Sequence, residues 1–408
     1  MRATTVLNRV LVLPHARVTG VTVTAEGDVV ADVRLRRRRL LCPCGVWSSA
    51  AYDSSVRRWR HLDVAGARLY LRARVRRVAC AGCQRVRTEQ VPWARPSARH
   101  TLAFEDTVAW LTQRCDKTTV SALMRCAWST ISAIAARVVG DHLGDDRLDG
   151  LRRIGVDEIS YRFGHRYLTI VVDHDTSRVV WVSEGRSVAA LMVFYDALGP
   201  QRCGLLEAVS MDMGPAYRGA TQRAAPQAVI CLDPFHVMQW AGRAIDNAFN
   251  AATAGQDPLN LRGKDFTRTR VLLRSGGDTL SDAQRSQIHA FRRSRYQLFH
   301  AWELKEALRD LYRCTAPADA RAYLQAWIAT ALDSNIPAFT DLARRLQPHF
   351  YGIAAAVELG LSNSRVEGLN ARIRLIHRRG YGYHTAAALS ALIYLCCSRL
   401  AIALPTTT

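Results

Sequence analysis

The stretch RRIGVDEIS at residues 152–160 decides the fold of the central part of this chain. A short apolar run ends there on Asp157, and a second run ends in the same way on Asp212 in VSMDMGPAY. Apolar runs of this length, bounded by turn residues, are typical of buried strands. A third acid, Glu367, lies in SNSRVEGLNARIR, where the pattern is helical instead. Two strand-borne aspartates and one helix-borne glutamate are therefore the first candidates for a catalytic site.

The segment around these aspartates has the pattern of strands alternating with helices. Three strands, a helix and two further strands are predicted at Ile154–Ser160, Tyr167–Asp173, Val179–Ser183, Val188–Leu198, Leu206–Met211 and Ala228–Leu232. Three antiparallel strands followed by helix–strand alternation is the order of a ribonuclease-H-like α/β sheet. The first and fourth strands are neighbours in that topology, so we expect Asp157 and Asp212 to lie side by side.

The third acid belongs to an amphipathic helix. Steps of three and four residues place four apolar side chains on one face: Val366, Leu369, Ile373 and Ile376. A polar stripe repeats these steps one position over: Glu367, Asn370, Arg374 and His377. An acid, an amide and a guanidinium in this order suit contacts with a metal, a phosphate and the DNA backbone. The alternative is a surface helix with a solvated charged face.

These elements divide the second half of the chain. Residues 149–250 are predicted to form the first part of the α/β catalytic core. Only helical patterns appear in residues 251–355, so we expect an all-helical insertion there. Residues 356–408 are then predicted to complete the core with the returning helix and a C-terminal helix.

The three acids suit a two-metal site. Phosphodiester chemistry is typically supported by two divalent ions that clamp the attacking and leaving oxygens. Hard carboxylate oxygens are the ligands that Mg²⁺ and Mn²⁺ prefer. We therefore expect Asp157 to bridge the ions, Asp212 to bind one of them and Glu367 the other.

Three more polar residues lie near these acids in the sequence. Glu158 alternates to the opposite side of its strand from Asp157, so it is not expected to share the ions. Asp233 and His236 follow the fifth predicted strand in the motif DPFHV. Asp233 is a candidate helix cap. His236 either contacts the scissile phosphate or is a satisfied polar residue at the start of a helix.

The composition indicates a globular and strongly basic chain. Its 408 residues are 49% hydrophobic and carry a formal net charge of +21, which favours a polyanionic partner such as nucleic acid. Residues 1–100 hold twenty arginines and six acids, so most of the surplus is N-terminal. The sequence has three lysines, so GC-rich coding is an alternative source of arginine. That bias does not explain an excess of cations over acids.

The sequence carries no signal for a membrane. No apolar run has the length of a transmembrane helix, and the N-terminal stretch VLNRVLVL lacks the features of a signal peptide. We therefore expect a cytoplasmic protein whose cysteines are reduced.

Residues 1–98 are predicted to form a β-rich, zinc-ribbon-like module that binds DNA. Period-two alternation with turn glycines indicates short strands. Two cysteine pairs, Cys42 with Cys44 and Cys80 with Cys83, favour a single four-thiolate zinc site. The first pair is one residue short of a usual knuckle, and the alternative is a metal-free β module. The candidate DNA contacts are clustered arginines: Arg36, Arg37, Arg38, Arg39, Arg57, Arg58, Arg76 and Arg77.

Residues 99–148 change to a helical period. Two short helices are followed by a third over Ser129–Val139, for which Ser129 or Thr130 is the predicted N-cap. The short break at Cys126–Trp128 favours a helix-turn-helix whose last helix enters a major groove. Its candidate DNA contacts are Ser129, Thr130, Ser132 and Arg137. The alternative is an ordinary helical hairpin that packs on the next domain.

The motifs together resemble a known family. GVDE at 155–158, SMDMGPAY at 210–217, DPFHV at 233–237 and SNSRVEGLNARIRLIHRRGYGY at 362–383 resemble bacterial insertion-sequence transposases, above all the ISL-three family of DDE transposases. The resemblance covers essentially the whole chain. It implies a DDE triad at Asp157, Asp212 and Glu367 with Mg²⁺ or Mn²⁺, and a D-x-x-H signature at Asp233 and His236.

The resemblance also implies a reaction and its partners. Metal-activated water cuts a phosphodiester at the end of the element, and the freed 3′-hydroxyl then attacks target DNA. The N-terminal modules would bind the terminal inverted repeats. Because two ends must be held together, a homodimer or a larger synaptic complex is expected.

Two rival functions share these features. A DNA-binding regulator derived from a transposase would bind the repeats without cutting them. A nuclease of the same fold would hydrolyse DNA without strand transfer and without repeat specificity. Inverted and direct repeats around the gene would favour transposition over both.

Overall fold

The computed structural model describes residues 2–254, 263–313, 316–361, 364–380, 383 and 385–405, apart from the side chains of 317 and 364–367. Its contacts divide the chain into two compact units. The first comprises Met1–Gly144 with Arg379–Thr408, and the second comprises Asp145–Arg378.

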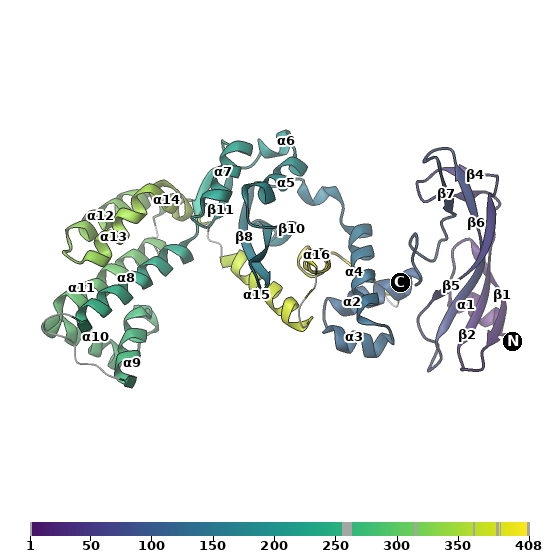
Figure 1. The fold of residues 1–408 in the computed structure, drawn as a ribbon, viewed down its shortest axis with the longest axis horizontal. Helices are drawn as coiled ribbons and strands as arrows, with labels where there is room; N and C mark the ends of the chain where they lie inside the picture. The colour runs from purple at the N-terminus through teal and green to yellow at the C-terminus, as the bar shows by residue number, and fades with distance from the viewer. Residues whose placement is uncertain are drawn as a thin grey trace. The chain divides into compact units, whose positions relative to one another are not determined.

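The first unit begins with a twisted β-sheet, drawn in purple and blue in Figure 1. Its strand order is β1-β2-β6-β5, and β7 pairs with β6. The elements are α1 (Ala3–Val10), β1 (Ala16–Val23), β2 (Val29–Leu35), β5 (Asp53–Arg60), β6 (Leu69–Cys80) and β7 (Arg85–Thr88), and a separate pair is β3 (Leu40–Leu41) with β4 (Trp47–Ser48). One face of the sheet packs on a small core that includes Trp59, Leu71 and Trp93. The predicted period-two alternation follows from this one-sided burial.

Four helices complete the first unit: α2 (Leu102–Thr112), α3 (Lys117–Met124), α4 (Trp128–His142) and α16 (Ala386–Cys397). The helix α16 packs on α4. The side-chain amide of Gln113 donates to the carbonyl oxygens of Leu395 and Leu400 at 2.8 and 3.1 Å. By these contacts α16 belongs to the first unit, whereas the sequence pattern indicated that it completes the catalytic core.

The second unit contains a five-stranded sheet of order β10-β9-β8-β11-β12. The pairs β10–β9 and β9–β8 are antiparallel, and β8–β11 and β11–β12 are parallel. Its elements are η1 (Asp145–Leu148), β8 (Arg153–Arg162), β9 (Arg166–Asp173), β10 (Arg178–Glu184), α5 (Val188–Leu198), α6 (Pro200–Cys203), β11 (Ala208–Met211), α7 (Pro215–Ala224) and β12 (Val229–Leu232). Each of the five predicted strands and the predicted helix is present.

A helical segment separates β12 from the helix that carries the third acid. It comprises α8 (Pro234–Ala254), α9 (Gly263–Arg274), η2 (Gly277–Thr279), α10 (Asp282–Ser294), α11 (Tyr296–Asp310), η3 (Leu311–Arg313), η4 (Pro317–Asp319), α12 (Ala320–Asp333), α13 (Pro337–Leu346), η5 (Gln347–His349) and α14 (Phe350–Glu358). The long helix α8 runs without a break through the expected boundary at residue 250. Its inner side chains and those of the sheet share one hydrophobic core.

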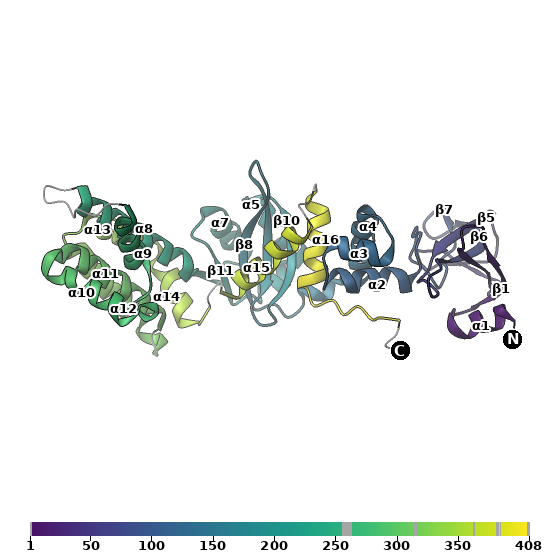
Figure 2. The same ribbon diagram turned by 90° about the horizontal axis from the view of Figure 1, so that it is seen from below.

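The segment returns to the sheet through α14, which packs on β12. A Cβ atom on Gly352 would lie 2.8 Å from the side chain of Leu232, so this close approach requires glycine. The helix α15 (Ser364–Arg379) follows. Figures 1 and 2 both show α15 beside β8.

The predicted N-cap at Ser129 or Thr130 is wrong, because α4 begins at Trp128 and its N-cap is Ala127, whose side chain cannot accept a hydrogen bond.

Within the described residues no single helix is long and apolar enough to cross a membrane, and the bent pair α3–α4 passes that test only when both helices are taken together.

Candidate functional site

Three aspartates lie on or directly after three adjacent parallel strands, with Asp157 within β8, Asp212 after β11 and Asp233 after β12. Ser210 on β11 pairs with Gly155 on β8, and Met211 pairs with Leu232 on β12. Asp157 and Asp212 therefore each lie two residues beyond the Gly155–Ser210 pair, and Asp233 directly follows Leu232. Because neighbouring parallel strands carry side chains at equal register on the same face, the three carboxylates form one row across β8, β11 and β12.

Asp157 is held by two hydrogen bonds. The backbone N–H of Glu158 donates to its Oδ1 at 2.7 Å, and Nδ2 of Asn370 donates to its Oδ2 at 2.5 Å. Burial raises the pKa of the Asp157 carboxyl to about 6, against the opposing effect of these two donors. A carboxylate that is this costly to ionise is suited to a cation, whose charge would offset the loss of hydration.

Asp212 is fixed by the turn that follows β11. The N–H of Gly214 donates to Asp212 Oδ1 at 2.9 Å. A Cβ atom on Gly214 would lie 2.9 Å from the same oxygen, so a larger residue would displace the carboxylate. The next residue, Pro215, begins α7 with no N–H to lose. The MDMGP motif thus combines an acid with the turn that orients it.

Asp233 and His236 form a pair at the start of α8. Asp233 Oδ1 accepts from the N–H of Phe235 at 3.2 Å, and its Oδ2 lies 3.0 Å from Nδ1 of His236. Asp233 therefore has the capping position that the sequence suggested. It raises the pKa of the His236 imidazole, and the charges of Asp212 and Asp157 act in the same direction. These charges favour the protonated form of His236, which would carry a positive charge toward an anionic substrate.

The returning helix α15 contacts β8 at two points. Asn370 reaches Asp157, and Nε2 of His377 lies 2.8 Å from the carbonyl oxygen of Tyr161. Arg374 is exposed on α15. Glu367 belongs to the same helix, but its side chain lies outside the described residues. The amide oxygen of Asn370 is buried without a hydrogen-bond partner in the described part of the chain, as expected of a group beside a ligand site.

Two polar side chains near the aspartates differ in their surroundings. Glu158 forms an ion pair with Arg186 at 3.4 Å. The hydroxyl of Tyr312 on η3 is buried without a described partner, and burial together with the charge of Asp233 raises its pKa. Tyr312 escaped the sequence reasoning because it lies in the helical insertion, far along the chain from the motifs.

Four cysteines converge in the first unit. The sulfur atoms of Cys42, Cys44, Cys80 and Cys83 all lie within 4.8 Å of one another. Cys42 and Cys83 are 3.8 Å apart, and Cys44 and Cys80 are 3.5 Å apart. A tetrahedral zinc ion with Zn–S bonds near 2.3 Å separates its sulfurs by about 3.8 Å. The four thiols therefore fit Zn²⁺, and the shortened first pair does not prevent their convergence.

The turns around the cysteines explain this fit. Gly45 has φ +91° and donates its N–H to the carbonyl of Cys42 at 2.9 Å, which closes the first turn within the short pair. At the second pair, a Cβ atom on Gly82 would lie 2.6 Å from Val46. Hydrogen bonds from the backbone N–H groups of Cys83 and Gly82 lower the pKa of Cys80 to about 6, which favours the thiolate that zinc binds.

The helices α3 and α4 have the geometry of a helix-turn-helix. They meet at 98°, and Arg125 in the turn adopts a left-handed conformation. Of the predicted DNA contacts, Ser129 is exposed and Thr130 is half-buried. Ser132 accepts a hydrogen bond from Lys117, and Arg137 donates two to Glu105. Arg137 thus has a structural partner that its sequence position did not reveal.

The predicted arginine contacts of the β module separate into two groups. Arg36, Arg37, Arg38 and Arg76 line one groove. The others lie outside it: Arg39 approaches the ring of Trp47, Arg58 stacks on Tyr70, Arg77 pairs with Asp53, and Arg57 is exposed. Alternation along the strands decides which arginines share a face.

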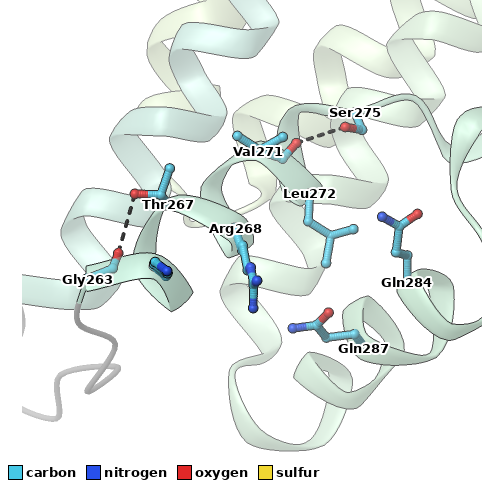
Figure 3. Close-up of a pocket in the computed structure, with 9 residues that line it drawn as sticks. Gly263, Thr267, Arg268, Val271, Leu272, Ser275, Gln284 and Gln287 are labelled. Carbon is cyan, nitrogen blue, oxygen red and sulfur yellow. Dashed lines mark hydrogen bonds between the residues drawn. The ribbon is translucent and has the colours of Figure 1, made fainter.

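A further cavity of about 820 Å³ lies between α9 and α10 in the helical insertion. Figure 3 shows Arg268, Gln284 and Gln287 directed toward it. Its lining includes none of the predicted site residues.

Comparison with known proteins matches this arrangement of domains. A family model described as a transposase matches residues 154–393, a range that contains all three predicted acids. The chain belongs to the ISL3 family of transposases. The helix-turn-helix domain of transposase family ISL3 matches residues 89–139, and the zinc-finger of transposase IS204/IS1001/IS1096/IS1165 matches residues 44–83.

Two curated relatives agree with this membership. The transposase for insertion sequence element IS1557 of Mycobacterium tuberculosis, known from two strains, is 38% identical over 393 residues, 90% of this chain and 88% of that protein. The transposase for insertion sequence element IS1001 of Bordetella parapertussis is 29% identical over 346 residues, 84% of this chain and 85% of that protein.

The family membership confirms the predicted function. The chain is a DDE transposase, an enzyme that binds and cleaves DNA, with zinc-finger, helix-turn-helix and catalytic domains in that order along the chain. The zinc-finger match and the cysteine cluster both support the predicted Zn²⁺.

Proposed function

We propose that this transposase cleaves and joins DNA with a two-metal site formed by Asp157, Asp212 and Glu367 on a ribonuclease-H-like core. The observation that carries the proposal is the hydrogen bond from Asn370 to Asp157. Glu367 precedes Asn370 by three residues, which is close to one helical turn, so the two share a stripe of the helix. A helix that brings Asn370 to Asp157 would also bring Glu367 toward the same strand, which supports its place in the proposed triad.

The strand order supports the ribonuclease-H-like assignment. An antiparallel β10-β9-β8 meander continued by the parallel strands β11 and β12 is the order expected of that fold. The long helical segment between β12 and α15 then corresponds to the insertion. In this proposal the catalytic domain comprises residues 149–250 and 356–378, with the insertion between them.

The chemistry of the donors supports Mg²⁺ or Mn²⁺. Carboxylate oxygens of Asp157 and Asp212, with a carboxylate supplied by Glu367, are the hard ligands these ions prefer. Bound divalent ions would supply activation of water and stabilisation of the leaving oxygen. Among the described residues, only the four cysteines form a cluster with enough ligands for a metal ion. The acidic site is complete only with the carboxylate of Glu367, whose side chain lies outside the described residues.

The other residues have positioning and binding roles. Asn370 holds the Asp157 carboxylate in one orientation, and Gly214 does the same for Asp212. His236, whose protonated form is favoured by the hydrogen bond with Asp233, attracts the phosphodiester to the row of acids when it carries a proton. Arg374 is exposed about two helical turns beyond Glu367 on the same stripe, where a guanidinium suits the DNA backbone.

The substrate in this proposal is the end of the mobile element. The helix-turn-helix and the zinc module bind the terminal inverted repeats, with arginines on phosphates and α4 on base edges. Two copies of the chain, or more, hold two ends together before strand transfer to target DNA.

A cleavage assay tests the proposal. Purified transposase is incubated with an end-labelled element terminus and Mg²⁺, and the products are separated on a denaturing gel. We expect discrete nicks at the repeat boundary that Asp212→Ala abolishes. Repeat binding without any nick in Mg²⁺ or Mn²⁺ would favour a regulator. Nicks that are indifferent to the repeat and never joined to target DNA would favour a nuclease.

A further inference from the structure

The solvent face of the N-terminal sheet carries a cluster of arginines. Arg17 on β1 pairs directly with Arg34 on β2. Parallel pairing of Asp32 with Arg72 sets the register between β2 and β6, so Arg34 and Arg74, two residues further on, follow on the same face. Arg17, Arg34 and Arg74 are exposed, and their strand neighbours Val18, Val33 and Val75 are buried in the core. Alternation thus directs all three guanidinium groups to solvent.

These side chains line one groove. A cavity of about 800 Å³ lies over the same face. Its lining contains seven arginines and a single acid, Glu89, and the arginines are Arg17, Arg34, Arg36, Arg37, Arg38, Arg74 and Arg76. We call this surface the arginine groove.

The single acid of the groove is already in use. Glu89 is fully buried and accepts two hydrogen bonds from the Arg76 guanidinium and one from its backbone N–H. Arg37 lies 4.0 Å from the same carboxylate, and among the described residues two of its side-chain nitrogens are buried with no hydrogen-bond partner. In the described part of the chain no carboxylate lies within ion-pair distance of Arg17, Arg34, Arg36, Arg38 or Arg74. The groove therefore keeps a large positive charge that the protein does not neutralise.

Such an arrangement works against the stability of the free protein. Like charges on directly opposed strand positions destabilise a sheet. If these arginines served only solubility, acids among them would neutralise part of the charge. Directly beside the groove this is the case, because Arg72 forms two hydrogen bonds with the carboxylate of Asp32. An unneutralised row of guanidinium groups is suited to a polyanion, which releases its own counterions on binding.

We propose that the arginine groove binds the phosphodiester backbone of duplex DNA and positions it without reading its sequence. Guanidinium groups bind phosphate oxygens through paired hydrogen bonds. The groove lies on β1, β2 and β6, outside the helix-turn-helix that carries the recognition helix, and most of its arginines precede the matched zinc-finger range. The inference rests on DNA binding by the transposase and adds a second, sequence-independent contact surface to it.

The test compares two triple variants of the full-length protein. Arg17→Gln, Arg34→Gln and Arg74→Gln together remove three charges from the groove. Arg68→Gln, Arg85→Gln and Arg87→Gln remove three charges from exposed positions of the same module that do not line it. Affinity is measured without divalent metal, over a range of salt, for a labelled element terminus and for a shuffled duplex of equal length.

The expected result is a loss common to both DNA probes. Each arginine that contacts a phosphate contributes about 0.9 to the slope of log affinity against log salt, so the groove variant should lose about 2 to 3 from that slope. At low salt we expect its affinity for either probe to fall roughly tenfold or more, with the ratio between the probes unchanged. The control variant should lose much less.

Three outcomes would overturn the proposal. They are an unchanged salt slope in the groove variant, an equal loss in the control variant, and a loss confined to the element terminus, since the last would mean that the groove reads bases. Unfolding of the variant is excluded by two control measurements. Because the substitutions remove like charges that repel one another, the melting temperature should be unchanged or higher, and the zinc content should be unchanged. A metal-free binding assay is also independent of the catalytic assignment, so either can fail alone.

Discussion

Asn370 donates a hydrogen bond of 2.5 Å to Asp157, which joins α15 to β8 across 213 residues of sequence. Asn370 is 3% exposed, so water does not compete for this contact. The bond connects the two halves of the predicted catalytic core directly at the carboxylate. It also makes an amide, rather than only the three acids, part of the proposed site.

Removal of this amide should weaken catalysis without removing a charge. Partners that orient a metal ligand typically contribute 10- to 100-fold to metal affinity or activity, so we expect about that loss of cleavage rate in Asn370→Ala. The concentration of Mg²⁺ needed for half-maximal cleavage should rise as well. Arg372→Ala, an exposed change on the same helix, is the matched control. Wild-type cleavage and metal dependence in Asn370→Ala would contradict a positioning role.

The three acids should be separable from DNA binding. Asp157→Asn, Asp212→Asn and Glu367→Gln keep the side-chain volume and remove one negative charge each. We expect each variant to lose cleavage by at least about a thousandfold, because the site then lacks a ligand, and to bind the terminal repeat with nearly wild-type affinity. Gel-shift and cleavage assays on the same preparations provide the comparison. Full cleavage by any one of them would remove that residue from the triad.

The buried carboxylate should cost stability when no metal is bound. The pKa of Asp157 is raised from 3.8 to about 6 in the folded protein. An acid whose folded pKa is raised leaves stability intact below pH 4 and lowers it as the pH rises through 6. The difference corresponds to about 3 kcal/mol at pH 8.

Asp157→Asn removes this penalty. In the absence of divalent metal it should melt at a higher temperature than wild type at pH 8, and at a similar temperature near pH 4. Calorimetry at the two pH values measures the effect. A lower melting temperature for the variant at pH 8 would show that hydrogen bonding to the ionised carboxylate outweighs its burial.

The cysteine cluster should bind one zinc ion per chain. Because structural zinc contributes folding free energy directly, Cys80→Ser should lose the metal and unfold the segment around Cys42–Cys83. Metal analysis and protease sensitivity of that segment are the measurements. Cys115→Ser, outside the cluster, should retain zinc. A wild-type protein purified without zinc, and folded in this segment, would refute the assignment.

Glu105 should be critical for the helix-turn-helix. Its side chain is fully buried and pairs with Arg95 and Arg137. Removal of one member of a buried ion network leaves charges unpaired and typically costs about 3–5 kcal/mol. Glu105→Ala should therefore lower the melting temperature of the first unit and weaken repeat binding. Asp145→Ala, at an acid that is 92% exposed, should leave both unchanged.

The sequence predicts best the elements whose signal is local. Residues Ile154–Ser160 were expected as a strand, and β8 spans Arg153–Arg162. Buried strands between turn residues have such a signal because both faces are apolar. The row of aspartates followed from topology, since the strands that carry these acids become neighbours in a ribonuclease-H-like order.

The remaining features depend on register or on partners far along the chain. Arg17 and Arg74 escaped notice because cross-strand pairing, not clustering in the sequence, brings them together. Arg137 has the position of a DNA contact in the sequence, yet Glu105 on another helix binds it. The apolar pattern of Ala386–Cys397 indicates burial but does not indicate against which helix. Tertiary contacts decide all three.

The packing of α16 on α4 has a consequence for the order of synthesis. The helix-turn-helix leaves the ribosome early, but the helix that covers it is made only after the entire catalytic unit, Asp145–Arg378. A nascent or truncated chain therefore exposes the apolar side of α4 that α16 would bury. Completion of the DNA-binding half is thereby coupled to translation of the catalytic half, so that a transposase fragment lacking its last helix gives a poor competitor for the element ends.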